Sequence, residues 1–225
     1  MIFWWKKVLP NDMNVKLVSI TKPNVYGLNN AEDLICYCAR VSNPSNQLNL
    51  ETAPRLLNYL INHEHWSPME MVSMCVEIQT SRAIAAQIIR HKSFSFQEFS
   101  LRYSNVTSYE DIEWRMQGKT NRQVGDEVVN LSPELKEEVD NVLQSSMKSY
   151  EKLLEKGLAK ECARMILPLC TETTLFMTGT ARSWIHYLQL RTKEDTQKEH
   201  RNIALEIQKI FVENFPNVSK ALNWI

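Results

Sequence analysis

The sequence predicts an α+β fold in which a central, largely antiparallel sheet is flanked by long helices. Apolar and polar residues alternate from Met71 to Thr80, and a period of two is typical of a strand with one packed face. From 132 to 157 the apolar residues recur at three- and four-residue steps, which is typical of a long amphipathic helix. No strand–helix alternation with a G-x-G-x-x-G turn is present, so a dinucleotide-binding parallel sheet is not predicted.

The chain before Met71 is predicted to form one strand and two helices. Residues 15–20 are strand-like. Residues 31–40 suit a helix whose N-terminal cap is Asn29 or Asn30, because a side-chain amide oxygen accepts from a free backbone N–H there. A second helix begins at 52, where a proline follows just inside the first turn, and it ends near 63.

After the strand predicted at 71–80, a short helix is predicted over 83–89, with Ser81 as its cap. Gln87 and Arg90 lie three positions apart and therefore share a face. Residues 104–131 are mostly polar with scattered glycines, so we expect a mobile surface loop containing a short helix.

The C-terminal half is predicted to be helical. The long helix begins at Ser132–Pro133 and ends at Gly157, and we expect it to act as scaffold. A short helix over 159–167 is halted by a proline, another runs from about 175 to 191, and the last runs from 193 to 215 and ends at Pro216. Three residues of the third helix are expected to face inward: Trp184, Ile185 and Leu188.

Composition narrows the class of partner. Lysine plus arginine number 26 and aspartate plus glutamate number 26, so the net charge does not indicate a nucleic-acid or membrane partner. The apolar opening at 1–5 is too short for a signal peptide or a membrane span. Five cysteines without paired C-x-x-C spacing indicate free thiols in a reducing compartment. The run 63–65 has two histidines but no complementary cluster of cysteines or histidines, so no metal site is predicted. With the free thiols, this predicts a cytoplasmic protein without a metal.

Residues 90–103 combine the groups that a phosphorylated, planar ligand requires. Guanidinium, ammonium and hydroxyl groups suit phosphate oxygens. Three phenylalanines and a tyrosine offer stacking surface for a heterocycle. A structural reading stands beside this one, because basic residues also favour a helix C-terminus and aromatic alternation also suits a half-buried strand.

The same stretch resembles a known family. Arg90-His91-Lys92-x-x-Ser95-x-Gln97-Glu98-x-Ser100-x-Arg102-Tyr103 resembles the R-H-R-x-x-S-x-N-E-x-S-x-R-Y motif of the flavin-dependent thymidylate synthases. Lys92 replaces an arginine and Gln97 replaces an asparagine. Both replacements keep the chemical type of the side chain, a cation and an amide, although lysine lacks the bidentate fork of arginine.

Further matches extend from His65 to Glu199. The segment 65–71 resembles H-x-[ST]-P-x-E-H, with Met71 in place of the final histidine, and 163–169 is similar to A-R-x-x-L-P-L. The segment 180–191 resembles N-A-R-S…N/H…L-R, with Thr180 in place of asparagine, and Gln197 and Glu199 match Q-x-E.

The resemblance implies a single domain over residues 1–225 that methylates dUMP to dTMP. Methylenetetrahydrofolate would supply the carbon, reduced FAD would supply hydride, and NADPH would re-reduce the flavin. The cofactor carries the redox step while the protein binds, orients and polarises. The family implies a homotetramer with active sites between subunits, and no cysteine nucleophile.

Residue roles follow from the same resemblance. Arg191 would be catalytic, stabilising negative charge on the uracil ring. Ser100 would donate a hydrogen bond, His91 would pack as a neutral ring, Lys92 would meet a flavin phosphate, and Thr180 cannot replace both functions of an amide. The residues implied for dUMP are Gln87, Arg90, Glu98, Phe99, Ser100, Leu101, Arg102, Arg164 and Arg191. Those implied for FAD are Ser67, Arg90, His91, Lys92, Glu98, Thr180, Arg182 and His186.

Two alternatives remain open at this point. A nucleotide-binding module without catalysis would need the phosphate and base contacts but no flavin. A generic oligomerising α+β scaffold would bind no dUMP. Measurements of flavin absorbance and of dUMP binding distinguish these two alternatives from the enzyme.

Overall fold

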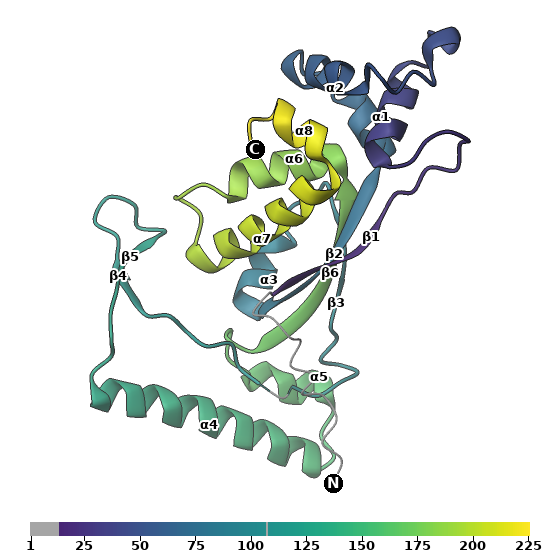
Figure 1. Ribbon diagram of the computed structural model, residues 1–225. Coiled ribbons are helices and arrows are strands. Elements are labelled where there is room, and N and C mark those ends of the chain that lie inside the picture. Colours follow the sequence, from purple (N-terminus) through teal and green to yellow (C-terminus); the bar gives the residue numbers. More distant parts are fainter. Residues whose placement is uncertain (1–13, 107) are drawn as a thin grey trace.

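A four-stranded antiparallel sheet organises the chain, with strand order β1-β2-β6-β3 (Figure 1). The computed structural model describes residues 14–106 and 108–225, so the apolar opening at 1–5 lies outside the described residues. The strands are β1 (Val15–Ile20), β2 (Ser73–Ser81), β6 (Glu172–Thr180) and β3 (Ser95–Glu98). The predicted α+β class and antiparallel sheet are confirmed.

The centre of the sheet is the β2–β6 pair, which is in register over nine residue pairs from Ser73↔Thr180 to Ser81↔Glu172. The prediction of a helix beginning near 175 is therefore wrong, because residues 172–180 are strand and only 181–191 are helical. Thr173, Leu175 and Met177 are buried while their neighbours are more exposed, which is the alternation of a strand.

Three helices cover one face of the sheet: α3 (Arg82–Ile88), α6 (Ala181–Arg191) and α7 (Lys198–Asn214) (Figure 1). Trp184, Ile185 and Leu188 are fully buried there, as predicted. The indole N–H of Trp184 donates to the Met74 carbonyl at 3.0 Å, which ties α6 to β2. On the opposite face, residues such as Gln79 and Phe176 stay exposed.

The N-terminal helices agree with the sequence prediction. Helix α1 spans Ala31–Ala39 and is capped by Asn30, whose side chain accepts from the Asp33 N–H at 2.9 Å. Helix α2 spans Ala53–Asn62. The 3₁₀ turns η1 (Pro44–Asn46) and η2 (Ser67–Met71) follow α1 and precede β2, respectively.

The segment 104–131 differs from its prediction. Its described part contains a small antiparallel hairpin, β4 (Arg115–Gln117) and β5 (Gly125–Val128), and no helix. The hairpin returns the chain towards the N-terminus of α7 and leads on to α4.

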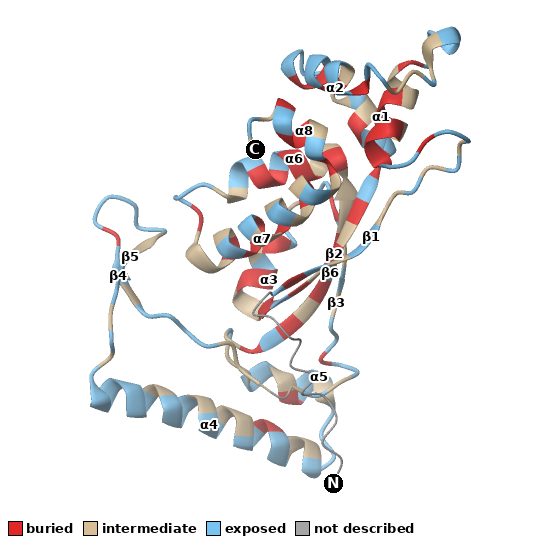
Figure 2. Ribbon diagram, viewed as in Figure 1, coloured by how far each residue is buried: buried red, intermediate tan, exposed pale blue. Residues whose placement is uncertain are grey.

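Helix α4 (Pro133–Glu155) begins at Ser132, whose hydroxyl accepts from the Leu135 N–H, as its sequence predicts. It is nevertheless largely exposed (Figure 2), and Tyr150 is its only buried residue. Leu135 and Val142, on its apolar face, are 51% and 61% exposed. The helix contacts the rest of the chain mainly through α5 and η3.

The remaining helix boundaries were predicted only in part. The helix predicted over 159–167 is split into α5 (Lys160–Ala163) and η3 (Arg164–Ile166). Helix α7 begins at Lys198 rather than at 193, and the proline at 216 opens a further helix, α8 (Pro216–Ala221). No described helix is both long and apolar enough to cross a membrane.

Candidate functional site

The two central strands each lead directly into a helix that carries candidate site residues. Strand β2 continues into α3, which contains Gln87 and is followed by Arg90 and His91. Strand β6 continues into α6, which ends at Arg191. Ser81 is the N-cap residue directly before α3, but its hydroxyl does not make the capping hydrogen bond that the sequence predicts. Paired strands therefore bring together residues that are about a hundred positions apart.

His91 and Arg191 meet at the ends of these two helices. The Arg191 Nε donates to the His91 Nε2 at 2.9 Å. A guanidinium can only donate, so the imidazole Nε2 accepts and the ring is neutral. Burial, and then the neighbouring Arg191 cation, lower the pKa of His91 to about 4. Among the described residues, the terminal nitrogens of Arg191 have no hydrogen-bond partner, so they can donate to a ligand.

A buried pair lies behind His91. The Tyr187 hydroxyl and the His200 Nε2 are 3.0 Å apart, and the His91 ring stacks edge-on against Tyr187 with centroids at 4.9 Å. His200 is fully buried, and burial, followed by the Arg191 cation, lowers its pKa to about 4. This packing holds His91 from the side away from solvent.

Glu98, assigned to both ligands, is fixed by two donors. Arg82 donates to its Oε1 at 2.9 Å and the Thr173 hydroxyl donates to the same oxygen at 3.0 Å. Arg82 also donates to the Phe99 carbonyl at 2.8 Å. Among the described residues the second carboxylate oxygen of Glu98 has no partner, so it is available for a ligand. Arg82 was not predicted, because only the tertiary fold brings it beside Glu98.

The phosphate-type groups lie further along, where β3 leaves the sheet towards α5. Ser100 and Arg102 line an open depression of about 420 Å³ with Tyr103 and residues 159–161. Arg102 pairs with Glu161 at 3.2 Å, and both side chains are more than half exposed. Exposed pairs of this kind contribute little stability, so a phosphate could replace the carboxylate. Leu101 is buried, so only its main chain suits ligand contact.

The residues assigned to FAD from α6 already have protein partners. The Thr180 hydroxyl accepts from the Ser183 N–H at 3.2 Å and so caps α6. Arg182 pairs with Glu70. His186 stacks edge-on against Trp66, with ring centroids at 5.2 Å, and Trp66 directly precedes Ser67 at the start of η2. Arg182 and His186 thus lie where α6 packs against η2.

Three cations of the predicted site have no partner. Within residues 14–106 and 108–225, the side chains of Arg90, Lys92 and Arg164 form no hydrogen bond or ion pair with the protein. Arg90 and Lys92 are exposed and Arg164 is half-buried. Cations without protein counter-charges favour an anionic ligand. Among the described residues, no hydrogen bond or ion pair joins Arg164 or the Ser100 depression to the Arg191–His91 pair, whereas Arg90 and Lys92 flank His91 in the chain.

Two other chemistries lack support. No group of three or more potential metal ligands is present among the described residues. The five cysteines are free, and burial raises the pKa of the Cys36 thiol to about 12 and also raises those of Cys38, Cys75 and Cys170. Raised thiol pKa values disfavour a nucleophilic thiolate.

Fold and site together describe a class: an α+β protein with exposed cations and hydroxyls, which are groups that suit phosphorylated, planar ligands. The family model described as thymidylate synthase complementing protein matches residues 24–217. The chain belongs to that family, the flavin-dependent thymidylate synthases.

Individual relatives agree with this membership. A probable flavin-dependent thymidylate synthase of Paramecium bursaria Chlorella virus 1 is 50% identical over 216 residues, covering 95% of this chain and 100% of that protein. A flavin-dependent thymidylate synthase of Synechocystis sp. is also 50% identical, covering 94% and 100%. The crystal structure of the UMP/dUMP methylase PolB from Streptomyces cacaoi, bound with 5-Br dUMP, has a TM-score of 0.77 at 24% identity, with 94% of each chain covered. That similarity shows a shared fold.

Proposed function

We propose that this chain catalyses the reductive methylation of dUMP to dTMP, with methylenetetrahydrofolate as carbon donor. When bound, reduced FAD supplies the hydride, and NADPH restores the reduced flavin. The observation that carries the proposal is the pair formed by Arg191 and neutral His91 in a chain that matches flavin-dependent thymidylate synthases over their whole length.

The residues present fit an anionic dinucleotide cofactor. Arg90 and Lys92 are exposed and unpaired in the described chain, so they offer charge-assisted donors to flavin phosphates. Neutral His91 adds a planar ring without adding another charge. The Thr180 hydroxyl is already used as a helix cap, so we assign it the weakest flavin contact. Ser67, Arg182 and His186 complete the proposed flavin surface.

For dUMP, each group has a distinct task. Arg191 would stabilise negative charge that develops on the uracil ring, in the manner of an oxyanion hole. Ser100 and Arg102 would hold the phosphate. Arg164 supplies a third unpaired cation, while Gln87, Glu98, Phe99 and Leu101 complete the proposed nucleotide site.

We further propose a homotetramer whose active sites form between subunits, in the cytoplasm. No hydrogen bond or ion pair joins the phosphate depression to the Arg191–His91 pair within the described chain. The exposed apolar residues of α4 and the open face of the sheet offer surface for neighbouring copies. Cross-linking or light scattering at micromolar concentration tests the tetramer.

An anaerobic assay tests the activity. Purified protein is supplied with dUMP, methylenetetrahydrofolate, FAD and NADPH, and dTMP is measured by chromatography. Formation of dTMP only when all four are present supports the proposal. Binding of dUMP without flavin binding or dTMP would instead support a nucleotide-binding module, and no dUMP binding would indicate a structural role for the motif.

A further inference from the structure

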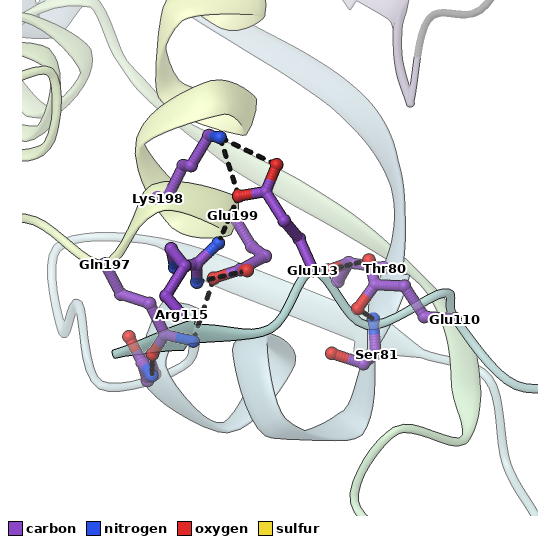
Figure 3. Close-up of polar contacts among 9 residues, drawn as sticks. Thr80, Ser81, Glu110, Glu113, Arg115, Gln197, Lys198 and Glu199 are labelled. Atoms are coloured by element: carbon purple, nitrogen blue, oxygen red, sulfur yellow. Dashed lines mark hydrogen bonds and ion pairs between the residues drawn. The ribbon is translucent and has the colours of Figure 1, made fainter. Parts of the chain in front are cut away.

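A chain of hydrogen bonds links the Gln87 side chain to the β4–β5 hairpin. The Gln87 Nε2 donates to the Gln197 Oε1 at 2.6 Å, and the Gln197 Nε2 donates to the Glu199 Oε2 at 3.0 Å. The other oxygen of Glu199 accepts from Arg115 at 2.5 Å. Figure 3 shows Arg115 reaching from the hairpin to Glu199 at the start of α7.

Charge fixes the direction of every bond in this chain. An ionised carboxylate can only accept, so the amide of Gln197 must turn its NH₂ group towards Glu199. Its carbonyl oxygen then faces Gln87, which must in turn present its own NH₂ group. Burial raises the pKa of Glu199, but hydrogen bonds from Arg115 and Gln197 outweigh burial and hold it below its usual value. Glu199 is therefore ionised at neutral pH.

Arg115 anchors the chain at its outer end. Only 12% of its side chain is exposed, and it also bonds to Glu113 at 2.8 Å. Lys198 holds Glu113 from the other side at 2.6 Å (Figure 3). Ion pairs of alternating charge therefore join the hairpin to the start of α7. Glu199 is held by Arg115 at one oxygen and by Gln197 at the other.

We propose that Glu199, Gln197 and Arg115 are positioning residues that fix the amide orientation of Gln87, so that its carbonyl oxygen selects a pyrimidine carrying an N3–H. This inference rests on the proposed function, which places Gln87 at the nucleotide. Gln87 lies on α3, four positions before His91, and its remaining carbonyl oxygen can only accept, so we place it at a donor of the ring rather than at the phosphate oxygens.

The selection follows from the chemistry of the two rings. Uracil has an N–H donor at N3, whereas cytosine has an acceptor at the same position. The Gln87 Oε1 has no hydrogen-bond partner among the described residues, so it is free to accept from N3–H. Towards cytosine it would face an unpaired acceptor, which is costly in a desolvated site.

The test compares dUMP with dCMP in flavin-loaded protein of residues 1–225. The substitution E199Q lets the Gln197 amide turn, because a glutamine at 199 can donate as well as accept. We expect the ratio of dUMP to dCMP affinity to fall at least tenfold, and kcat/KM for dUMP to fall through KM. Q197M, which deletes the acceptor for Gln87, should lower the same ratio. K198Q, which alters only the outer contact to Glu113, is the matched control and should keep it.

Folding and function are read separately. Circular dichroism and bound-flavin absorbance identify the variants that fold. If E199Q does not fold, Q197M is the variant whose discrimination is measured. If the unmodified protein makes dTMP and a folded E199Q or Q197M variant keeps its discrimination, this inference is wrong and the proposed function stands. If the unmodified protein neither binds dUMP nor makes dTMP, the proposed function itself fails.

Discussion

Replacing Arg191 by alanine gives the most direct test of the proposed chemistry. The substitution removes the two terminal nitrogens that have no described protein partner and deletes the bond to His91. Loss of one donor of this kind typically lowers kcat by about 10²–10³, or about 3–4 kcal/mol of transition-state stabilisation. We expect a loss in this range or larger, because a full positive charge is removed with the donors.

His91 supplies an independent readout of the same substitution. Burial is the larger cause of its lowered pKa and the Arg191 cation is the second. The pKa in R191A should therefore rise from about 4 but stay below the ordinary histidine value, which a nuclear magnetic resonance titration measures. Flavin absorbance should be retained, because Arg191 is assigned to the uracil. R201A, which removes an arginine from α7 with one weak contact to the Glu194 carbonyl, is the control. Turnover of R191A within twofold of the unmodified protein would refute the assigned role.

Three further outcomes are expected. K92R should bind FAD as tightly as the unmodified protein or more tightly, because it restores a forked phosphate contact; weaker binding in a flavin titration would contradict this role for Lys92. G179A should lower Tm by about 2–10 °C in a thermal melt, because its Cβ would lie 2.5 Å from the buried Phe94 ring and overpacking costs about 1–3 kcal/mol; an unchanged Tm would show that the ring moves freely. His200 is neutral when folded with a pKa of about 4, so the unfolded chain binds the extra proton between about pH 6.5 and 4, and this group should lower stability by at most about 3 kcal/mol as pH drops through that window, in addition to the contribution of His91. Urea midpoints measure it; H200Q should flatten the slope and H63Q, at an exposed site, should not.

The elements predicted correctly are those whose local signals agree with their packing. Ser132 and Asn30 cap their helices as their side chains predict. The alternation in β2 matches its one buried face. Strand β6 was missed because its apolar run continues directly into the helix that follows, and short apolar runs do not distinguish strand from helix by period. The hairpin at 115–128 is short and polar, so no hydrophobic period marks it.

The candidate site was predictable where its residues are consecutive. The motif at 90–103 supplies most of the named groups in one stretch. Arg82, Arg115 and His200 could not be found in this way, because each reaches its partner only through tertiary packing.

The β2–β6 pairing has a consequence for how the protein acquires its ligands. The Thr178 hydroxyl donates to the Met74 carbonyl across 104 positions of the chain. Closing so long a loop costs entropy before any contact is gained, and folds dominated by distant pairings form slowly. His91 and Arg191 follow these two strands, so their contact can exist only after that closure. We expect flavin to bind at the end of refolding, with the same time constant as the final recovery of native structure.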